Sequence, residues 1–185
     1  MPQQHSEGSV SPQSFAMNSE LVTPTMELRP EFQNMVAAYR SAGEARYQDV
    51  ELDEVGFASY LQTLADSASG ILPGPDLVPQ TTCWLVNNGA LIGIVRIRHH
   101  LSESLRIEGG HIGYDISPPF RNQGYGHKLL DLALEKALEI GIEQAMITCD
   151  SDNLPSRKII ERRGAVFDGE SISPHSGKTV LRYWI

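Results

Sequence analysis

The stretch ISPPFRNQGYGHKLLDLALEKALEIG, Ile116–Gly141, decides the fold of this chain. Two prolines end a strand-like run, because proline cannot donate to a strand ladder. Apolar residues then recur at helical spacing, which predicts a helix from about Gly124 to Ile140. Gly141 ends this helix, and the apolar run EQAMITCD follows as a strand after a short loop. This order predicts two parallel strands joined by a right-handed crossover.

The loop RNQGYG at the head of this helix predicts a site for phosphate. A helix N-terminus offers unpaired backbone N–H groups and the positive end of a dipole, and the two glycines let a bulky anion approach them. The loop is neither a P-loop nor a GxGxxG dinucleotide fingerprint. A glycine pair also occurs in ordinary tight turns. The surrounding pattern favours the anion site, because a second helix opens at Asn153 just after the next strand.

Outside this stretch, the chain predicts one domain with a leader. The 185 residues, 41% of them hydrophobic, suffice for one sizeable core. Residues 1–18 are rich in Ser, Gln, Pro and Gly and are predicted to be a flexible leader before a single domain at residues 19–185. No apolar run approaches the roughly 20 residues of a membrane span, and the N-terminus lacks the pattern of a signal peptide.

The remaining segments alternate between helical and strand patterns. Asn88-Gly89 is the strongest local turn signal and predicts a hairpin between TTCWLVN and ALIGIVRIRHHL. LSESLRIE is interpreted as a connector. Further strands are expected at ELVTP, GGHIGYDIS, AVFD and TVLRYWI, and further helices near residues 25–43, 56–69 and 154–163. The pattern predicts an α+β fold with a mixed, mainly antiparallel sheet and helices on both faces.

Charge and cysteine content limit the partners. A formal net charge of -8 without clustered Lys and Arg argues against a nucleic-acid partner. An acidic chain could attract a cationic amine, although acidity also simply keeps proteins in solution. Cys83 and Cys149 both lie in apolar strand-like runs, where a free thiol behaves as a small hydrophobe, so a reduced, cytoplasmic setting is expected. The histidines have no matched carboxylate or cysteine set, so no metal is expected.

The motif before the long helix is similar to that of a known family. Arg121, Gly124 and Gly126 stand between a strand and a long helix in the order [RQ]-x-x-G-x-[GA]. With this motif, the segment from about Gly109 to Ala165 resembles the GNAT superfamily of acyl-CoA-dependent acyltransferases. The resemblance implies a central sheet of about seven strands and acetyl-CoA as cosubstrate. The phrases EGGHIGY and RYWI are also similar to those of a GNAT subgroup of predicted acetyltransferases.

A second segment carries the same resemblance. Asn153-x-x-Ser156, followed by Ile159-Ile160 and Gly164, resembles the family pattern Asn-x-x-[AS]-x-x-x-[aromatic]-x-x-x-Gly. By the resemblance, Asn153 bonds the pantetheine arm, while its side-chain oxygen could at the same time cap a helix. The resemblance assigns the following residues to the coenzyme: Tyr114, Asp115, Ile116, Arg121, Asn122, Gln123, Gly124, Tyr125, Gly126, His127, Asn153 and Ser156.

Acetyl transfer to an amine requires a donor for the oxyanion and a base for the amine. Attack on the thioester forms an oxyanion, for which a backbone N–H near Ile116 is the natural donor. The attacking amine must be neutral, so a base helps, and Glu108, His111, Tyr114 and Asp150 are the candidates. Glu108 and Tyr114 are favoured because family members often place a base on this strand. His111 is kept as a candidate, although an isolated histidine is more often a structural residue.

One departure from the family leaves a rival open. Many members carry a tyrosine that protonates the departing thiolate, and Ile160 stands at the matching position. A thiolate is already a fair leaving group, so an N-acetyltransferase acting on a primary amine of a small molecule, peptide or protein remains the leading hypothesis. The alternative is a non-catalytic acyl-CoA-binding sensor or interaction module.

Some properties stay open from the sequence. The acceptor, the acyl length, and the base and acid are not fixed by these patterns. The acceptor cleft is expected between the helices before Ser69, the loop GILPGPDLVPQ and the segment Gly169 to Lys178. The C-terminal RYWI could pair as an edge strand in a homodimer, or Tyr183 and Trp184 could complete the core.

Overall fold

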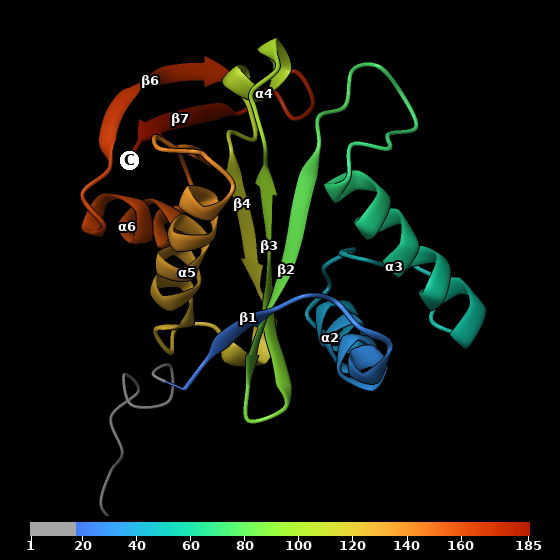
Figure 1. The fold of residues 1–185 in the computed structure, drawn as a ribbon. Coiled ribbons are helices and arrows are strands. Elements are labelled where there is room, and N and C mark those ends of the chain that lie inside the picture. Colours follow the sequence, from blue (N-terminus) through green and yellow to red (C-terminus); the bar gives the residue numbers. More distant parts are fainter. Residues whose placement is uncertain (1–17) are drawn as a thin grey trace, which may run out of the picture.

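A computed structural model of the chain describes residues 18–185, in which a seven-stranded sheet has the order β1-β2-β3-β4-β5-β7-β6. The expected α+β fold with a mixed, mainly antiparallel sheet is confirmed (Figure 1). Nearly all of the predicted leader lies outside the described residues. The strands are β1 (Glu20–Val22), β2 (Gln80–Asn87), β3 (Ala90–Arg98), β4 (Ile112–Ile116), β5 (Met146–Asp150), β6 (Val166–Ile172) and β7 (Thr179–Trp184).

Helices cover both faces of this sheet. The α-helices are α2 (Arg29–Ser41), α3 (Glu54–Ala68), α4 (Glu103–Ile107), α5 (Tyr125–Glu139) and α6 (Leu154–Arg162), and the short 3-10 helices are η1 (Met26–Leu28) and η2 (Pro118–Phe120). Figure 1 places α5 and α6 on one side of the central strands and α2 and α3 on the other. The chain therefore forms three layers, with the sheet in the middle.

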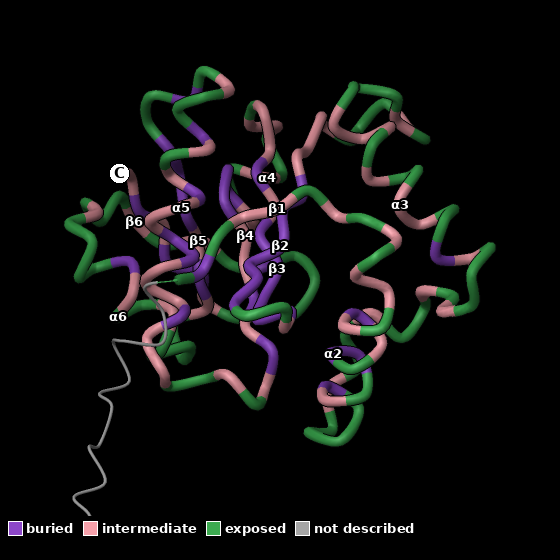
Figure 2. The backbone as a smooth tube through the Cα atoms, turned by 60° about the horizontal axis from the view of Figure 1, so that its bottom comes forward, coloured by how far each residue is buried: buried purple, intermediate pink, exposed green. Residues whose placement is uncertain are grey.

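The sheet separates two apolar cores, and strand alternation feeds both. On β2, Leu85 packs into the core under α5 and α6, whereas Trp84 stacks on Phe32 of α2 with ring centroids 5.3 Å apart. Buried residues accordingly concentrate along the central strands and the inner sides of the helices (Figure 2). Because β2 and β3 are buried on both faces, they read in the sequence as continuous apolar runs.

The predicted hairpin is confirmed. Asn88 and Gly89 join β2 to β3 with φ angles of 48° and 81°, both in the left-handed region that a two-residue type I′ turn requires. The antiparallel pairing of β3 with β4 extends this hairpin into the centre of the sheet.

The strands β4 and β5 are parallel but barely paired. Their register consists of one pair, Ile112 opposite Ile147, while every other neighbouring pair in the sheet is antiparallel. The parallel relation predicted from the strand-helix-strand order is confirmed. Beyond this pair the two strands diverge, so one edge of β4 has no strand beside it.

Caps and one glycine contact fix the helices around this gap. The predicted cap of α6 is confirmed, because Asn153 Oδ1 accepts a hydrogen bond from the N–H of Ser156 at 3.2 Å. Gly126 brings α5 close to α6, since a Cβ at Gly126 would lie 2.6 Å from Ile159 Cδ1. This glycine therefore also allows the two helices to pack closely.

Two expectations are wrong. LSESLRIE contains the helix α4, capped by the Ser102 hydroxyl, which accepts from the N–H of Leu105 at 3.3 Å. The segment RYWI cannot serve as an edge strand between subunits, because β7 lies inside the sheet between β5 and β6. Tyr183 instead completes the core at 2% exposure.

Within residues 18–185, no helix is both long enough and apolar enough to cross a membrane. Cys83 and Cys149 are buried free thiols on β2 and β5, as expected.

We expect Gly93→Ala to lower the free energy of unfolding by about 1–3 kcal/mol, because overpacking at a rigid contact is destabilising. A Cβ at Gly93 would lie 2.4 Å from the carbonyl oxygen of Asp115, in the backbone of β4. Urea unfolding measures the effect. The matched control is Gly74→Ala, where a Cβ would meet nothing within 4 Å. Equal stability of the two variants would contradict the close approach of β3 to β4.

Candidate active site

The loop before α5 presents a row of free backbone donors. Within the described part of the chain, the N–H groups of residues 122–126 donate to no protein acceptor. Asn122 and Gly124 hold φ angles of 60° and 88°, and these left-handed turns redirect the backbone at the helix entrance. Arg121 and His127, which the resemblance also assigns to the coenzyme, do not belong to this row, because the N–H of Arg121 donates to Pro118 and that of His127 to Gly124. Such a nest at a positive helix end is a site for an anion.

The side chain of Arg121 is engaged elsewhere. Its guanidinium donates to both carboxylate oxygens of Glu44, at 2.5 and 2.9 Å, and to the carbonyl oxygen of Ile116 at 3.0 Å. It also lies over the ring of Tyr39, 5.6 Å from its centroid. The paired charges raise the pKa of Arg121 and lower the pKa of Glu44. The loop therefore offers an anion its amides, while the arginine ties it to the segment after α2.

The free edge of β4 continues from this loop. Hydrogen bonds from Ser117 N–H to Ile92 and from Arg98 N–H to His111 show that odd-numbered residues of this strand bond to β3. The backbone groups of Tyr114 and Ile116 therefore point toward β5, where no strand pairs with them. Both residues are among those that the resemblance assigns to the coenzyme. An extended ligand could pair here as an additional strand.

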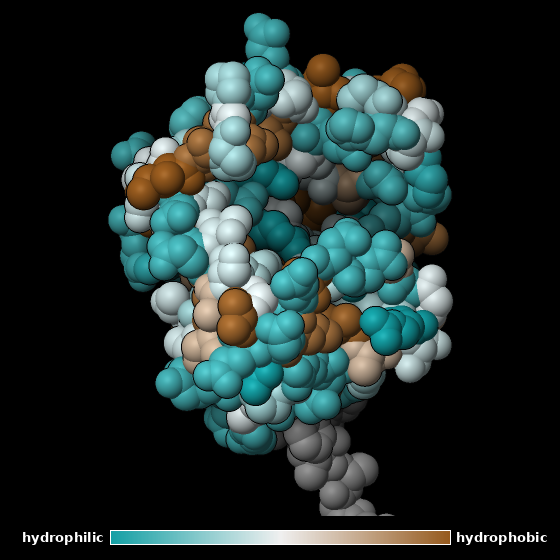
Figure 3. Space-filling view, turned by 90° about the vertical axis from the view of Figure 1, so that its right-hand side faces the viewer, coloured by the Kyte–Doolittle hydropathy of each residue, from teal (hydrophilic) through white to brown (hydrophobic). Residues whose placement is uncertain are grey.

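A cavity of about 250 Å³ lies where β4 and β5 diverge. It is lined by Arg46, Arg98, Glu108, Gly109, Ile112, Gly113, Tyr114, Thr148, Cys149, Asp150, Asn153, Ser156 and Val180. Figure 3 faces the side of the molecule that carries α2 and α3 and shows a hollow with strongly hydrophilic side chains in its floor. The lining residues come from segments on both faces of the sheet. The cavity is therefore open to one ligand from each face.

Two hydroxyl groups meet at this cavity. The oxygen atoms of Tyr114 and Ser156 lie 3.1 Å apart, which joins β4 to the start of α6. Burial raises the pKa of Tyr114 to about 12, so its phenol stays protonated near neutral pH. Asn153 lies beside them, and its amide nitrogen makes no hydrogen bond to the described residues. These groups can donate hydrogen bonds to a ligand in the gap.

Glu108 supplies a carboxylate to the same cavity. Its Oε2 accepts a hydrogen bond from the Ser173 hydroxyl at 2.6 Å, and the residue lies at the end of α4. Asp150 is a second lining carboxylate, with its Oδ2 3.9 Å from Lys178 Nζ. Glu108 is thus a candidate base that Ser173 holds in place, whereas Asp150 has the cation Lys178 near it.

His111 lies in a different setting from the other base candidates. It is 8% exposed, and its Nδ1 accepts a hydrogen bond from the N–H of Met146 at 2.9 Å. It is not among the residues that line the cavity. Burial, together with the nearby positive charges of Arg106, Arg98 and His100, lowers its pKa. This geometry is that of a neutral histidine that bridges β4 and β5.

The side chains of two predicted coenzyme residues are occupied inside the protein. The Asp115 carboxylate accepts hydrogen bonds from the hydroxyls of Tyr39 and Tyr47, at 2.6 and 2.7 Å, and pairs with Arg96 at 3.1 Å. The hydroxyl of Tyr125 accepts from the side-chain amide of Asn87 at 2.8 Å. Only their backbone groups remain for a ligand. Asp115 instead fixes β4 to the layer of α2.

Sequence reasoning missed the two arginines of the cavity. Arg98 ends β3, and Arg46 comes from the segment between α2 and α3. The pair Arg96 and Arg98 in the strand RIRHH carries the signal, because alternate residues of a strand share one face. Arg46 has no such signal, since an irregular loop brings it to the site.

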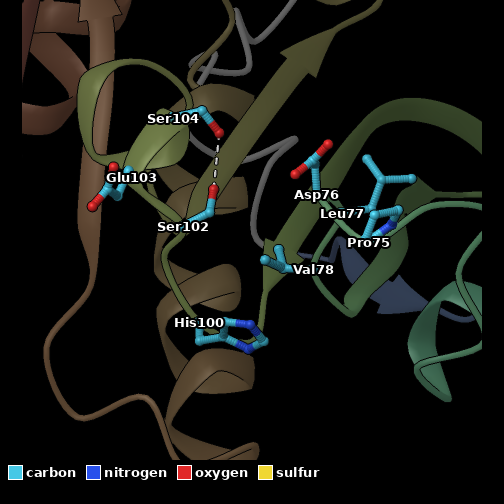
Figure 4. Close-up of a pocket in the computed structure, with 8 residues that line it drawn as sticks. All are labelled: Pro75, Asp76, Leu77, Val78, His100, Ser102, Glu103 and Ser104. Atoms are coloured by element: carbon cyan, nitrogen blue, oxygen red, sulfur yellow. Dashed lines mark hydrogen bonds between the residues drawn. The ribbon is translucent and has the colours of Figure 1, made fainter.

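Two of the segments expected to form the acceptor cleft lie at different hollows. A larger hollow of about 500 Å³ lies between residues 75–78 and residues 100–104 (Figure 4). In that view Glu103 and Leu77 lie on opposite sides and point away from each other. These two side chains therefore do not converge on the hollow. The segment Gly169 to Lys178 does reach the smaller cavity, through the contact of Ser173 with Glu108. Residues 18–185 contain no group of three or more His, Cys, Asp or Glu side chains placed to hold a metal ion.

Comparison with known families gives an independent view of this site. Residues 31–166, well over half of the chain, match the family model described as an acetyltransferase (GNAT) domain. This match includes the loop before α5 and both diverging strands. No curated protein matches the chain at a significant level.

Solved structures with the same fold are numerous. An acetyltransferase from Salmonella typhimurium that modifies the N-terminal serine of 50S ribosomal subunit protein L7/L12 is 15% identical, with a TM-score of 0.64 over 92% of this chain and 96% of that one. Mycobacterium smegmatis RimJ, in complex with CoA-disulfide, is 15% identical with a TM-score of 0.69 over 90% of this chain and 81% of its own. The microcin C7 self-immunity acetyltransferase MccE, in complex with acetyl-CoA and AMP, is 14% identical with a TM-score of 0.66, over 91% and 92%.

We expect the free energy of unfolding to fall as the pH drops below about 6.5, and His111→Asn to weaken this dependence. The lowered pKa of His111 means that unfolding takes up a proton between the folded-state pKa and the ordinary value near 6.5, so stability rises with pH in that window. Urea unfolding between pH 5 and 7.5 measures the slope. An asparagine keeps an acceptor for the Met146 N–H.

The control for this experiment is His100→Asn, at an exposed position, which should leave most of the slope in place. Some slope should persist in the His111 variant as well, because burial also lowers the pKa of His99. An unchanged slope in His111→Asn would contradict a neutral, structural His111.

Proposed function

The chain belongs to the GNAT acetyltransferase family, and we propose that it transfers the acetyl group of acetyl-CoA to a primary amine by direct attack on the thioester. One observation carries this proposal. The free N–H groups of residues 122–126 lead, along the unpaired edge of β4, into the cavity between β4 and β5. A long ligand with a phosphate end and an amide-containing arm fits this sequence of features. The proposed setting is the cytoplasm.

The coenzyme would bind through backbone groups more than through side chains. The pyrophosphate accepts from the amides of residues 122–126 at the positive end of α5. The pantetheine amides pair with the backbone of Tyr114 and Ile116 on β4, and the side-chain amide of Asn153 donates to the same arm. The thioester then lies in the cavity that Tyr114 and Ser156 line.

The reaction needs three groups from this cavity. Glu108 accepts the proton of the attacking amine, whose lone pair forms the new bond to the thioester carbon. The N–H of Tyr114 or Ile116, both directed toward β5, donates to the oxyanion. The C–S bond breaks, and the thiolate takes a proton from the hydroxyl pair of Tyr114 and Ser156. Tyr114 lines the cavity and Ile116 does not, which favours the N–H of Tyr114.

The second candidate function is a non-catalytic acyl-CoA sensor. The observation that favours it is Ile160, which is fully buried in the core where many family members carry the acid tyrosine. The hydroxyls of Tyr114 and Ser156 favour the enzyme, because they provide a proton donor from a different element.

The choice of acceptors to test follows from the neighbours. One structural neighbour modifies the N-terminal serine of a ribosomal protein, so peptides with a free N-terminal serine belong in the panel beside small amines. Release of free CoA thiol from acetyl-CoA with any of these amines supports the enzyme. Tight binding of acetyl-CoA without thiol release on the whole panel would favour the sensor.

We expect Asn153→Asp to weaken acetyl-CoA binding by roughly tenfold while leaving the stability of the fold unchanged. Aspartate caps a helix as well as asparagine does, so the bond from the Ser156 N–H persists. The substitution removes the side-chain amide donor. Calorimetric titration with acetyl-CoA measures the affinity. The control is Asn34→Asp, the same change on the exposed face of α2, and equal affinity of the two variants would remove Asn153 from the site.

We expect Glu108→Gln to lower kcat/KM for the amine by about 100-fold or more, with the affinity for acetyl-CoA unchanged, because a glutamine cannot accept the proton. Glutamine keeps an acceptor for the Ser173 hydroxyl. Steady-state rates with the best amine of the panel measure the loss. The control is Glu103→Gln, an exposed residue of α4. A loss below about threefold in Glu108→Gln would exclude Glu108 as the base.

A further inference from the structure

Arg98 brings an unneutralised cation into the cavity. Its Nη1 donates to the carbonyl oxygens of Gly109 and Gly110, at 2.8 and 3.1 Å, which holds the guanidinium against the segment before β4. Within residues 18–185 it forms no ion pair. Its pKa is lowered by burial and by the neighbouring charge of Arg96, with no carboxylate acting against them. The half-buried guanidinium of Arg98 therefore lacks the carboxylate partner that buried charges usually have.

The glycines around Arg98 keep the guanidinium open. A Cβ at Gly109 would lie 3.4 Å from its Nη1, and a Cβ at Gly113 would lie 3.6 Å from the same atom. Both glycines line the cavity with Arg98. A larger side chain at either position would cover the guanidinium, so the bare backbone leaves its remaining N–H donors accessible from the cavity.

Asp115 alone does not balance the three arginines near the cavity, and the cavity is also lined by Glu108 and Asp150. Arg96 is neutralised by Asp115 at 3.1 Å, and the same carboxylate oxygen lies 3.8 Å from Arg46. One buried carboxylate thus serves two arginines, and Arg98 adds a third positive charge. The half-exposed Arg46 lines the cavity together with Arg98. Two guanidinium groups therefore face one small space.

This positive charge is not placed for the phosphates of the coenzyme. Arg98 lies against Gly109 and Gly113, at the start of β4, while the free amides of residues 122–126 follow the end of that strand. At about 3.3 Å per residue, the five residues of β4 alone separate the two places by roughly 15 Å. An anion at Arg98 therefore belongs to the other reactant.

We propose that the acceptor amine carries a carboxylate a few bonds from its nitrogen, and that Arg98, assisted by Arg46, binds this carboxylate. The inference rests on the proposed acetyl transfer, because it concerns the second substrate of the same cavity. A guanidinium matches a carboxylate through paired N–H donors, which would neutralise Arg98 and hold the amine near Glu108, which lines the same cavity. The carboxylate can belong to a free amino acid or to an acidic side chain near a peptide N-terminus.

The test uses matched pairs of acceptors that differ only in charge. Alanine and alaninamide represent the free amino acid, and C-terminally amidated peptides that begin with Ser-Asp or Ser-Asn represent the peptide. The wild-type protein should favour the carboxylate member of at least one pair by about 10- to 100-fold in kcat/KM. The pair with the larger ratio identifies the source of the carboxylate.

Variants of the arginines tie this preference to the cavity. Arg98→Gln should bring the ratio of the preferred pair close to one, and Arg98→Lys, which keeps the charge, should retain part of it. Arg46→Gln is a second variant at a half-exposed position, where unfolding is not expected, and should lower the ratio less. Arg106→Gln is the control, because this exposed arginine of α4 does not line the cavity. Thermal unfolding checks that each variant is folded.

The outcomes separate this inference from the proposed function. Turnover of amines with ratios near one, or with a ratio that Arg98→Gln and Arg46→Gln leave unchanged, overturns the carboxylate site and leaves acetyl transfer in place. If no amine is acetylated, titration of N-acetylalanine and N-acetylalaninamide into the CoA-loaded protein still measures whether the site prefers the carboxylate. Equal binding of these two, or none, then overturns the inference, while the missing turnover counts separately against the enzyme.

Discussion

The separation of β4 from β5 after one parallel pair is the constraint on which the site depends. A central strand normally has both edges bonded, and unpaired backbone groups in a protein interior are costly. Here Arg121 covers only the carbonyl of Ile116, so the rest of this edge of β4 is left for a ligand or for solvent. The same divergence opens the cavity between the layers. The gap therefore provides both the binding edge and the reaction space, and the coenzyme would complete the sheet.

Because β4 has so little pairing with β5, other neighbours must hold it in place. Asp115 supplies this hold, because its buried carboxylate is bonded by Tyr39, Tyr47 and Arg96 from three different segments. A buried charge is stable only when it is paired and hydrogen-bonded, so these partners are fixed together. The ion pair of Glu44 with Arg121 links the loop before α5 to the segment after α2. Both proposed substrate sites thus depend on the position of β4.

The sequence was a good guide where one short segment carries its own signal. The Asn-Gly hairpin, the Asn153 cap and the loop before α5 all follow from local chemistry and were predictable. The cavity was not, because its side chains come from segments that meet only in the folded chain. Arg46 reaches it from an irregular loop, and Ser173 reaches Glu108 from the other end of the chain. Likewise β7 looked like an edge because it is the last strand, but its place in the sheet depends on pairing that periodicity does not encode.

In the proposed reaction Ile160 takes no part in proton transfer, and the proton donor lies on a different element of the same fold. In the core under α5, an isoleucine there adds apolar packing and no longer supplies a proton. In the proposed mechanism the donor is on β4, because the Tyr114 hydroxyl meets Ser156 at the cavity and its pKa of about 12 keeps it protonated. Because the thiol has the lower pKa, transfer of the phenol's proton to the departing thiolate is uphill by a few pKa units, and it is completed when the ionised phenol regains a proton from solvent. The acid would then belong to the strand that also positions the thioester, which ties proton transfer to correct seating of the coenzyme.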